Sequence, residues 1–159
     1  MNNLSIKQVF LDSGISRNDV IFIHGDAGVA AQLIEVEIKY RFEYLIKNLI
    51  DFIGSSGTLV IPTFSYTFTK SQNFDVDNTP SDVGFFSESF RTYSGFCRSK
   101  NPNFSVSSFG KYSSEFANSR IDDCFGQNTA FDLLRKYNAK IICLGCEFDR
   151  VTFVHYVEQ

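Results

Sequence analysis

Two short apolar runs on either side of an amphipathic segment constrain this chain more than any other feature. Residues 20–24 and 57–62 each have the composition of a buried strand, and a glycine-bearing turn follows the first. Between them, apolar residues recur mostly at three- and four-residue spacing, which predicts an amphipathic helix over 36–53 that ends at Gly54. A strand, a helix and a strand of these lengths predict a βαβ unit with parallel strands and a right-handed crossover.

The rest of the chain continues the alternation of helices and strands. We predict helices over 84–92 and 130–137, strands over 105–109 and 139–145, and a final helix that starts near Asp149 or Arg150. Residues 63–80 are polar and aromatic without a clear period, so they should form a long surface loop and a candidate wall for substrate or cofactor. A length of 159 residues fits one domain of the α/β class over 1–159.

Composition and charge narrow the possible functions. With 43% apolar residues and 18 Phe, the chain can build a substantial core. A net charge of −3 without a visible basic cluster argues against a nucleic-acid partner. No segment approaches the roughly eighteen apolar residues of a membrane span, and the first residues lack the apolar run of a signal peptide. We therefore expect a cytoplasmic protein that acts on small molecules and has no membrane partner.

The four cysteines do not form a convincing metal or redox motif. Cys143 and Cys146 make a CxxC, but structural zinc needs four ligands, and Cys97 and Cys124 do not supply a second close pair. Cys143 also lies inside an apolar strand rather than at the start of a helix. We expect no metal, and four free thiols that behave as small buried hydrophobes.

Any imidazole base must be one of only two histidines, His24 and His155. Each lies at or near the end of a predicted strand, where ligands bind in open α/β sheets. His155 belongs to Thr152-x-x-His155-x-x-Glu158, and residues three apart share one face of a helix, so Glu158 could orient the ring and stabilise its protonated form. The plain alternatives are a hydrogen-bonded structural His24 and an exposed surface pair at 155 and 158.

Two further segments could bind an anion. The turn Gly25-Asp26-Ala27-Gly28 lacks a dinucleotide fingerprint, yet such a turn can present backbone N–H groups to a phosphate. Arg98 and Ser99 could add a guanidinium fork and a hydroxyl. The alternative for Arg98 is an ordinary surface residue in a loop.

Taken in order, these segments resemble the aminoglycoside N(3)-acetyltransferase family over nearly the whole chain. The paired Arg-Ser and the T-x-x-H-x-x-E motif are the more specific elements. The matching residues are Val20 through Gly25, Gly57 through Ser65, Thr79-Pro80-Ser81, Gly84, Phe90-Arg91, Gly95, Arg98-Ser99, Asn101-Pro102, Ser105, Gly110, Leu144-Gly145, Phe148-Asp149, Thr152, His155 and Glu158.

This resemblance implies a family-specific three-layer α/β/α fold with a largely parallel central sheet, distinct from the commoner acetyltransferase fold. It implies acyl transfer from acetyl-CoA, or another acyl-CoA, to an amino group of an aminoglycoside or amino sugar. By the resemblance, His155 is the general base, Glu158 orients it, and Thr152 lies near the thioester. His24, Gly25, Asp26, Arg98 and Ser99 would face CoA.

The chain departs from the family pattern at three places. Asn101-Pro102 stands where many members have His-Pro, and the first loop lacks the usual serines after its histidine. Family members also continue well beyond the T-x-x-H-x-x-E motif, so we expect a fold that is incomplete at its C-terminal end, with poor solubility or activity when expressed alone. The alternatives are an acyltransferase for a nucleotide-linked amino sugar in surface polysaccharide synthesis, and an inactive truncated relative.

Overall fold

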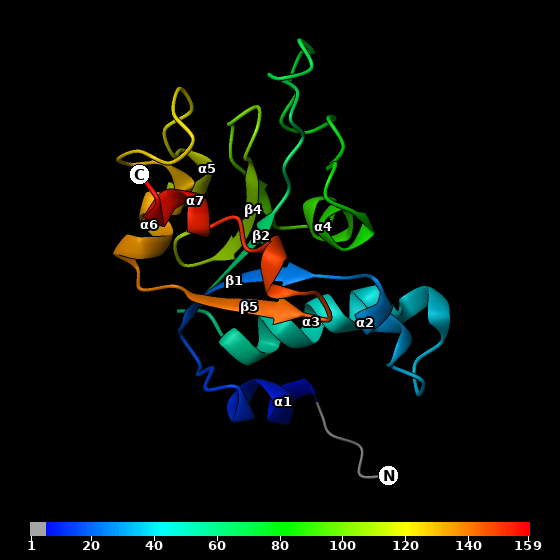
Figure 1. The fold of residues 1–159 in the computed structure, drawn as a ribbon. Coiled ribbons are helices and arrows are strands. Elements are labelled where there is room, and N and C mark those ends of the chain that lie inside the picture. Colours follow the sequence, from blue (N-terminus) through cyan, green and yellow to red (C-terminus); the bar gives the residue numbers. More distant parts are fainter. Residues whose placement is uncertain (1–5) are drawn as a thin grey trace.

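A five-stranded sheet forms the centre of the computed structural model, which describes residues 6–159 (Figure 1). The strands lie in the order β3-β4-β2-β1-β5. Their bounds are β1 Val20–Gly25, β2 Thr58–Pro62, β3 Cys97–Arg98, β4 Val106–Gly110 and β5 Lys140–Leu144. The α-helices are α1 Ile6–Asp12, α2 Gly28–Ala31, α3 Arg41–Ile53, α4 Phe85–Arg91, α5 Ser113–Ala117, α6 Ala130–Lys136 and α7 Val154–Val157. Two 3-10 turns, η1 Ile38–Tyr40 and η2 Phe148–Arg150, complete the chain.

The predicted βαβ unit is confirmed. β1 and β2 pair in parallel, with Val20 opposite Thr58, and α3 connects them. The predicted helix starts too early, because α3 begins at Arg41 and the preceding residues form η1. Ile38, counted as part of the apolar pattern, is 81% exposed, so its side chain contributes nothing to the core that fixes the helix.

The sheet is mixed, so the expectation of a largely parallel sheet is not supported. β5 pairs in parallel with β1, but β4 runs antiparallel to both β2 and β3. The reason is the connection: β3 and β4 form a hairpin, which returns the chain beside β2 in the opposite direction without a crossover helix.

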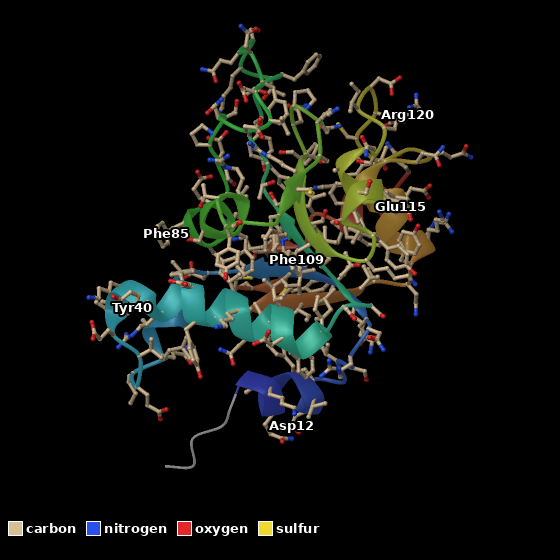
Figure 2. All side chains as sticks on the ribbon, turned by 180° about the vertical axis from the view of Figure 1, so that it is seen from behind. Asp12, Tyr40, Phe85, Phe109, Glu115 and Arg120 are labelled. Atoms are coloured by element: carbon tan, nitrogen blue, oxygen red, sulfur yellow. The ribbon has the colours of Figure 1, made fainter. Side chains whose placement is uncertain are left out.

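Alternating residues of the central strands supply two apolar clusters on opposite faces of the sheet. Ile21 and Ile23 pack with residues of α1, α3 and α4, whereas Val20 and Phe22 pack with residues of α5 and α6. Figure 1 shows α1 and α3 on one side of β1 and β5, with α6 and α7 on the other, and Figure 2 shows α3 in front of the sheet when seen from behind. Because helices cover both faces of the sheet, the ends of the strands are where a site can form.

The last predicted helix is wrong in its extent. It was expected from Asp149 or Arg150, but the chain forms η2, then an extended Val151, and only then the single turn α7. Val151 is 4% exposed and its ψ of 93° breaks the helix. Thr152 therefore precedes α7, whereas His155 lies on it and Glu158 is its C-cap residue.

A substitution of Gly110, at the end of β4, tests the antiparallel pairing of β4 with β2. Gly110 has φ of +111° and pairs with Thr58, and a Cβ there would lie 2.2 Å from the carbonyl oxygen of Gly57. We expect Gly110→Ala to lower the free energy of unfolding in urea by more than about 3 kcal/mol, since strain and a backbone clash add. Gly14→Ala is the matched control, because Gly14 has φ of +76° but open space around it. Equal losses in the two variants would contradict the close approach of β4 to Gly57.

Candidate active site

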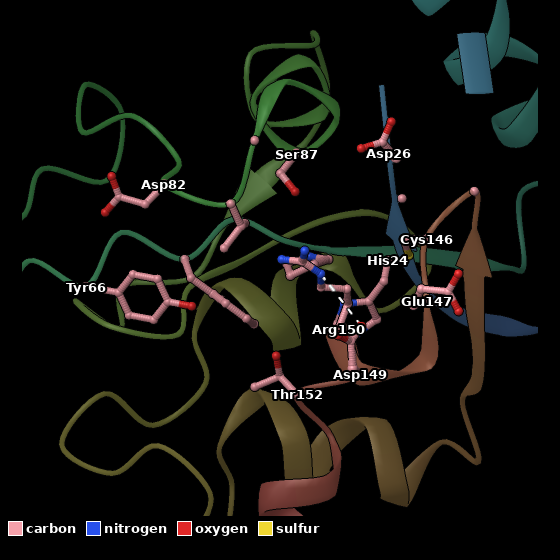
Figure 3. Close-up of a pocket in the computed structure, with 16 residues that line it drawn as sticks. His24, Asp26, Tyr66, Asp82, Ser87, Cys146, Glu147, Asp149, Arg150 and Thr152 are labelled. Atoms are coloured by element: carbon pink, nitrogen blue, oxygen red, sulfur yellow. Dashed lines mark ion pairs between the residues drawn. The ribbon is translucent and has the colours of Figure 1, made fainter. Parts of the chain in front are cut away.

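An open cleft of about 840 Å³ lies at the carboxyl ends of the three parallel strands (Figure 3). β1 contributes His24 and Gly25, β2 contributes Pro62, and the residues after β5 contribute Gly145 and Cys146. In open α/β sheets this edge is where ligands bind, because the loops that follow parallel strands converge there. The cleft is the candidate active site.

His24 forms a buried part of the cleft wall. Its ring meets the edge of Phe22 at 4.6 Å between centroids, and the side chain is 4% exposed. Burial lowers the pKa of His24 from 6.5 to about 4, so the imidazole is neutral at physiological pH. Its Nε2 atom is buried and has no hydrogen-bond partner. His24 is thus a neutral imidazole with an unsatisfied nitrogen at the cleft.

The turn after β1 is held by its own carboxylate. Asp26 Oδ1 accepts a hydrogen bond from the N–H of Gly28 at 2.7 Å, and the N–H of Asp26 donates to the carbonyl of Leu144. Gly25 is needed there because a Cβ would lie 2.5 Å from the ring of Phe86. Gly25 and Asp26 both line the cleft as predicted, but two N–H groups of the turn are engaged within the protein. Contact with CoA stays a prediction for both residues.

Only one of the three predicted catalytic residues lines the cleft. Thr152 lines the cleft, and its labelled side chain points into it in Figure 3. His155 and Glu158 do not line the cleft; their side chains are 57% and 72% exposed, with Nδ1 of His155 3.3 Å from Oε2 of Glu158. Thr152, in the cleft, and His155, outside it, are joined directly, because the N–H of His155 donates to the carbonyl of Thr152 at 3.1 Å. The histidine and the carboxylate therefore pair as their spacing predicts, but on the exposed surface, as in the plain alternative, and their catalytic roles stay a prediction.

Arg98 and Ser99 are buried, and both form hydrogen bonds with groups inside the fold. All three guanidinium nitrogens of Arg98 donate to protein oxygens: the carbonyls of Thr63, Val76 and Thr79, and the hydroxyl of Ser105. The group is 8% exposed, and burial lowers its pKa to about 10. Ser99 is fully buried and its hydroxyl accepts from the N–H of Val106. Neither residue lines the cleft, and their predicted contact with CoA has no geometric support here.

Of the charged residues that line the cleft, Asp26 was predicted from the sequence as a site residue, whereas Asp82, Glu147, Asp149 and Arg150 were not. Asp26, Asp82, Glu147 and Asp149 face a single cation, Arg150, among the lining residues. Lys70 pairs with Asp82 at 2.6 Å, and Arg150 lies 3.7 Å from Asp149. Residues 145–150 directly follow a parallel strand, so the strand-end rule applied to the two histidines would have identified them as well. The lining is predominantly acidic.

Tyr66 lines the cleft from the start of the long loop after β2. Its φ is +50°, an uncommon value for a residue with a bulky side chain, and hydrogen bonds from the N–H groups of Ser65 and Thr67 to residues 102–103 hold it there. Its ring contacts Phe104 at 5.8 Å between centroids. The expectation that loop 63–80 forms a cleft wall thus applies to its first residues, Phe64 and Tyr66.

The cysteines are free thiols, but the expectation that they are buried is wrong. Cys97 is exposed and Cys124, Cys143 and Cys146 are partly exposed. Burial, and after it Cys143, raise the pKa of Cys146 to about 11, so this cleft thiol is a weak nucleophile at neutral pH. Among residues 6–159, no group of three or more His, Cys, Asp or Glu is placed to hold a metal. In the same range, no helix has the length and apolar character to cross a membrane.

The buried imidazole predicts a specific pH dependence of stability. Between about pH 6.5 and pH 4 the unfolded chain takes up a proton at His24 that the folded chain does not, so stability falls as the pH is lowered through this window. The loss approaches about 3 kcal/mol from this residue. We expect His24→Asn to flatten the dependence of the Tm on pH in that window. Parallel Tm curves for the two proteins would contradict a buried neutral His24.

The Arg98 network predicts a structural role for a residue that sequence reasoning assigned to ligand binding. Arg98→Lys keeps the charge but loses the planar fork, which leaves at least one buried carbonyl unpaired. We expect the free energy of unfolding in urea to fall by about 2 kcal/mol. Arg120→Lys, at an exposed ion pair, should change it by less than about 0.5 kcal/mol. Equal changes in the free energy of unfolding in the two variants would show that the buried hydrogen bonds of Arg98 do not stabilise the fold.

Comparison with known proteins identifies relatives of the chain. The model of a family described as aminoglycoside 3-N-acetyltransferase matches residues 31–159. The chain is 23% identical to aminoglycoside N(3)-acetyltransferase IX of Micromonospora chalcea over 173 residues, covering 96% of this chain and 60% of that protein. It is also 23% identical, over 137 residues, to the SPbeta prophage-derived aminoglycoside N(3')-acetyltransferase-like protein YokD of Bacillus subtilis strain 168, covering 72% and 50% of the two chains.

A solved structure of AAC-IIIb in binary complex with CoASH shares the fold, with a TM-score of 0.81 and 22% identity over 96% of this chain and 62% of that one. The chain therefore spans about half to two thirds of the length of these relatives. The family model covers most of the chain, including the cleft wall from Tyr66 onward and the Thr152, His155 and Glu158 motif. The chain belongs to the aminoglycoside 3-N-acetyltransferase family.

Proposed function

We propose that this chain carries the catalytic wall of an enzyme that transfers an acetyl group from acetyl-CoA to an amino group of an aminoglycoside. One observation carries the proposal: Thr152 lies in the wall of the strand-end cleft, and the His155 and Glu158 pair follows it by one turn. Family membership and the shared fold with a CoASH complex support the choice of acyl-CoA as co-substrate.

We infer a division of labour between the two nitrogens of His155. Nδ1 faces Glu158 and donates to it, which leaves the lone pair on Nε2. In the proposed reaction Nε2 removes the proton from the amine as the amine attacks the thioester carbon, and the carboxylate holds the resulting imidazolium. The hydroxyl of Thr152 donates to the oxyanion that forms, and CoA leaves as the thiolate. The separation of 3.3 Å is long for such a pair and should shorten with substrate bound.

The charge of the cleft favours a cationic acceptor over the alternative, a nucleotide-linked amino sugar. Asp26, Asp82, Glu147 and Asp149 outnumber Arg150, so the lining attracts an acceptor that carries several protonated amines. Aminoglycosides are polyamines, which matches this lining. We infer that the acceptor approaches over the acidic lining toward Thr152 and His155.

Two finer features belong to the same proposal. Apolar clusters on both faces of the sheet support the family's three-layer α/β/α arrangement, with a mixed sheet in the middle. The free thiols and an acyl-CoA co-substrate support a cytoplasmic enzyme. The competing function is a non-catalytic relative that binds CoA without turnover, for which the exposure of His155 and Glu158 is the specific observation.

A direct assay tests the catalytic proposal. The protein is mixed with acetyl-CoA and an aminoglycoside, and release of free CoA is followed. We expect His155→Gln to lower kcat by about 10²–10⁴-fold, the usual contribution of a general base. Val157→Ala is the matched control, because Val157 lies on the same turn and is 71% exposed. Full activity in His155→Gln would rule out the proposed base, whereas CoA binding without any turnover in the unaltered protein would favour the non-catalytic relative.

A further inference from the structure

The helix that carries His155 is too short to be stable by itself. α7 has four residues, and isolated helices need about 12–15 residues to persist in water. Val154, His155 and Val157 are exposed, and Tyr156 is the one residue of α7 that is partly buried. The orientation of this turn therefore depends on Tyr156 and on the residues that precede it.

Tyr156 is attached to the neighbouring helix α6 by its hydroxyl, and its ring packs on the residue that precedes α7. The ring lies 5.3 Å from that of Phe153 between centroids. The hydroxyl donates to Oδ1 of Asp132 at 2.8 Å and accepts a hydrogen bond from Nε of Arg135 at 2.6 Å. Nη2 of Arg135 also donates to Oδ1 of Asp132 at 3.0 Å. A closed triangle of hydrogen bonds thus fixes the tip of Tyr156.

Asp132 is itself held at the start of α6. Its Oδ2 accepts a hydrogen bond from the N–H of Asn128 at 2.9 Å, and its own N–H donates to the hydroxyl of Thr129, the N-cap residue. The hydroxyl of Thr129 thus caps α6, and the carboxylate of Asp132 ties the residue before this cap to the first turn. The hydrogen bond from Asn128, and after it the one from the hydroxyl of Tyr156, lower the pKa of Asp132, so the carboxylate stays charged at neutral pH. α6 in turn packs on the sheet through Phe131, Leu133 and Leu134.

We propose that Tyr156 is a positioning residue that, through Asp132 and Arg135, sets the orientation of α7 and so places the His155 imidazole for its proton transfer. This inference rests on the proposed function of His155 as the base. A chain of contacts then runs from the sheet through α6 and Tyr156 to the base. Neither Tyr156 nor Asp132 touches the substrate in this arrangement. Misplacing a base by a fraction of its hydrogen-bond reach lowers the rate of proton transfer strongly, so loss of this chain of contacts should appear in kcat.

The two histidines of the chain make the position of His155 directly measurable. His155 and His24 give the only two imidazole Hε1 signals in the proton NMR spectrum, and His155→Gln assigns them. The test variant is Tyr156→Phe, which removes the hydroxyl and keeps the ring. A second variant, Arg135→Met, breaks the triangle from the α6 side without altering the ring next to His155. The matched control is Tyr137→Phe, because the hydroxyl of Tyr137 bonds Glu115 on α5 rather than a residue of α7.

At fixed pH we expect Tyr156→Phe and Arg135→Met to move the His155 signal in the same direction, and to leave the His24 signal in place. Amide hydrogen exchange at residues 154–158 should become faster in both, while Tyr137→Phe matches the unaltered protein. In the CoA-release assay, kcat of Tyr156→Phe should fall by about tenfold with the KM for acetyl-CoA within about twofold.

The outcomes separate this inference from the function on which it rests. An unchanged His155 signal and unchanged exchange in Tyr156→Phe would overturn the positioning role, whatever the activity. A shifted signal with unchanged kcat would also overturn it, since α7 would move without consequence for the reaction. Full activity in His155→Gln would instead remove the proposed base, and with it the reason to position it.

Discussion

The parallel pairing of β1 with both β2 and β5 is the constraint on which the rest of this structure depends. It brings three strand ends to one edge of the sheet, and the turns after them form the cleft. The pairing is specific because alternate residues of β1 fill two different apolar clusters, so a shift of one residue would exchange the faces. His24 and Thr152 are far apart in sequence but share the cleft for this reason.

The antiparallel hairpin of β3 and β4 supports one wall of the site without lining it. Arg98, at the end of β3, ties the beginning and the end of loop 63–80 together through the carbonyls of Thr63 and Thr79. That loop starts with Phe64 and Tyr66, which line the cleft, and Asp82 and Gly84 follow it on the same wall. A buried arginine is therefore a structural clamp that shapes the site without entering it. Buried guanidinium groups need several acceptors, and these backbone carbonyls supply them.

The sequence predicted the strands and the helix that show a clear apolar pattern. It missed the features that depend on contacts between residues far apart in the chain. The apolar runs of β1 and β2 and the helical spacing of α3 were sufficient to predict the βαβ unit, and the run of β5 was sufficient to predict a further strand. The direction of β4 could not be read from five residues, because it is set by the hairpin with β3 and by pairing with β2. Helical spacing brought His155 and Glu158 together correctly, yet Thr152 lies outside the helix because Val151 is buried in an extended conformation. The burial of Arg98 inside the fold could not be predicted, since three of its four acceptors are backbone carbonyls, which leave no mark in the sequence.

The proposed acetyl transfer requires that CoA bind in the strand-end cleft. The most direct measurement is a titration of the isotope-labelled protein with CoA, followed by two-dimensional amide NMR. The account predicts that the signals that move come from residues 24–28 and 145–152, which surround the cleft. Absence of any shift, or shifts confined to the separate hollow lined by Arg17, Asp51 and Phe109 on another part of the surface, would contradict it.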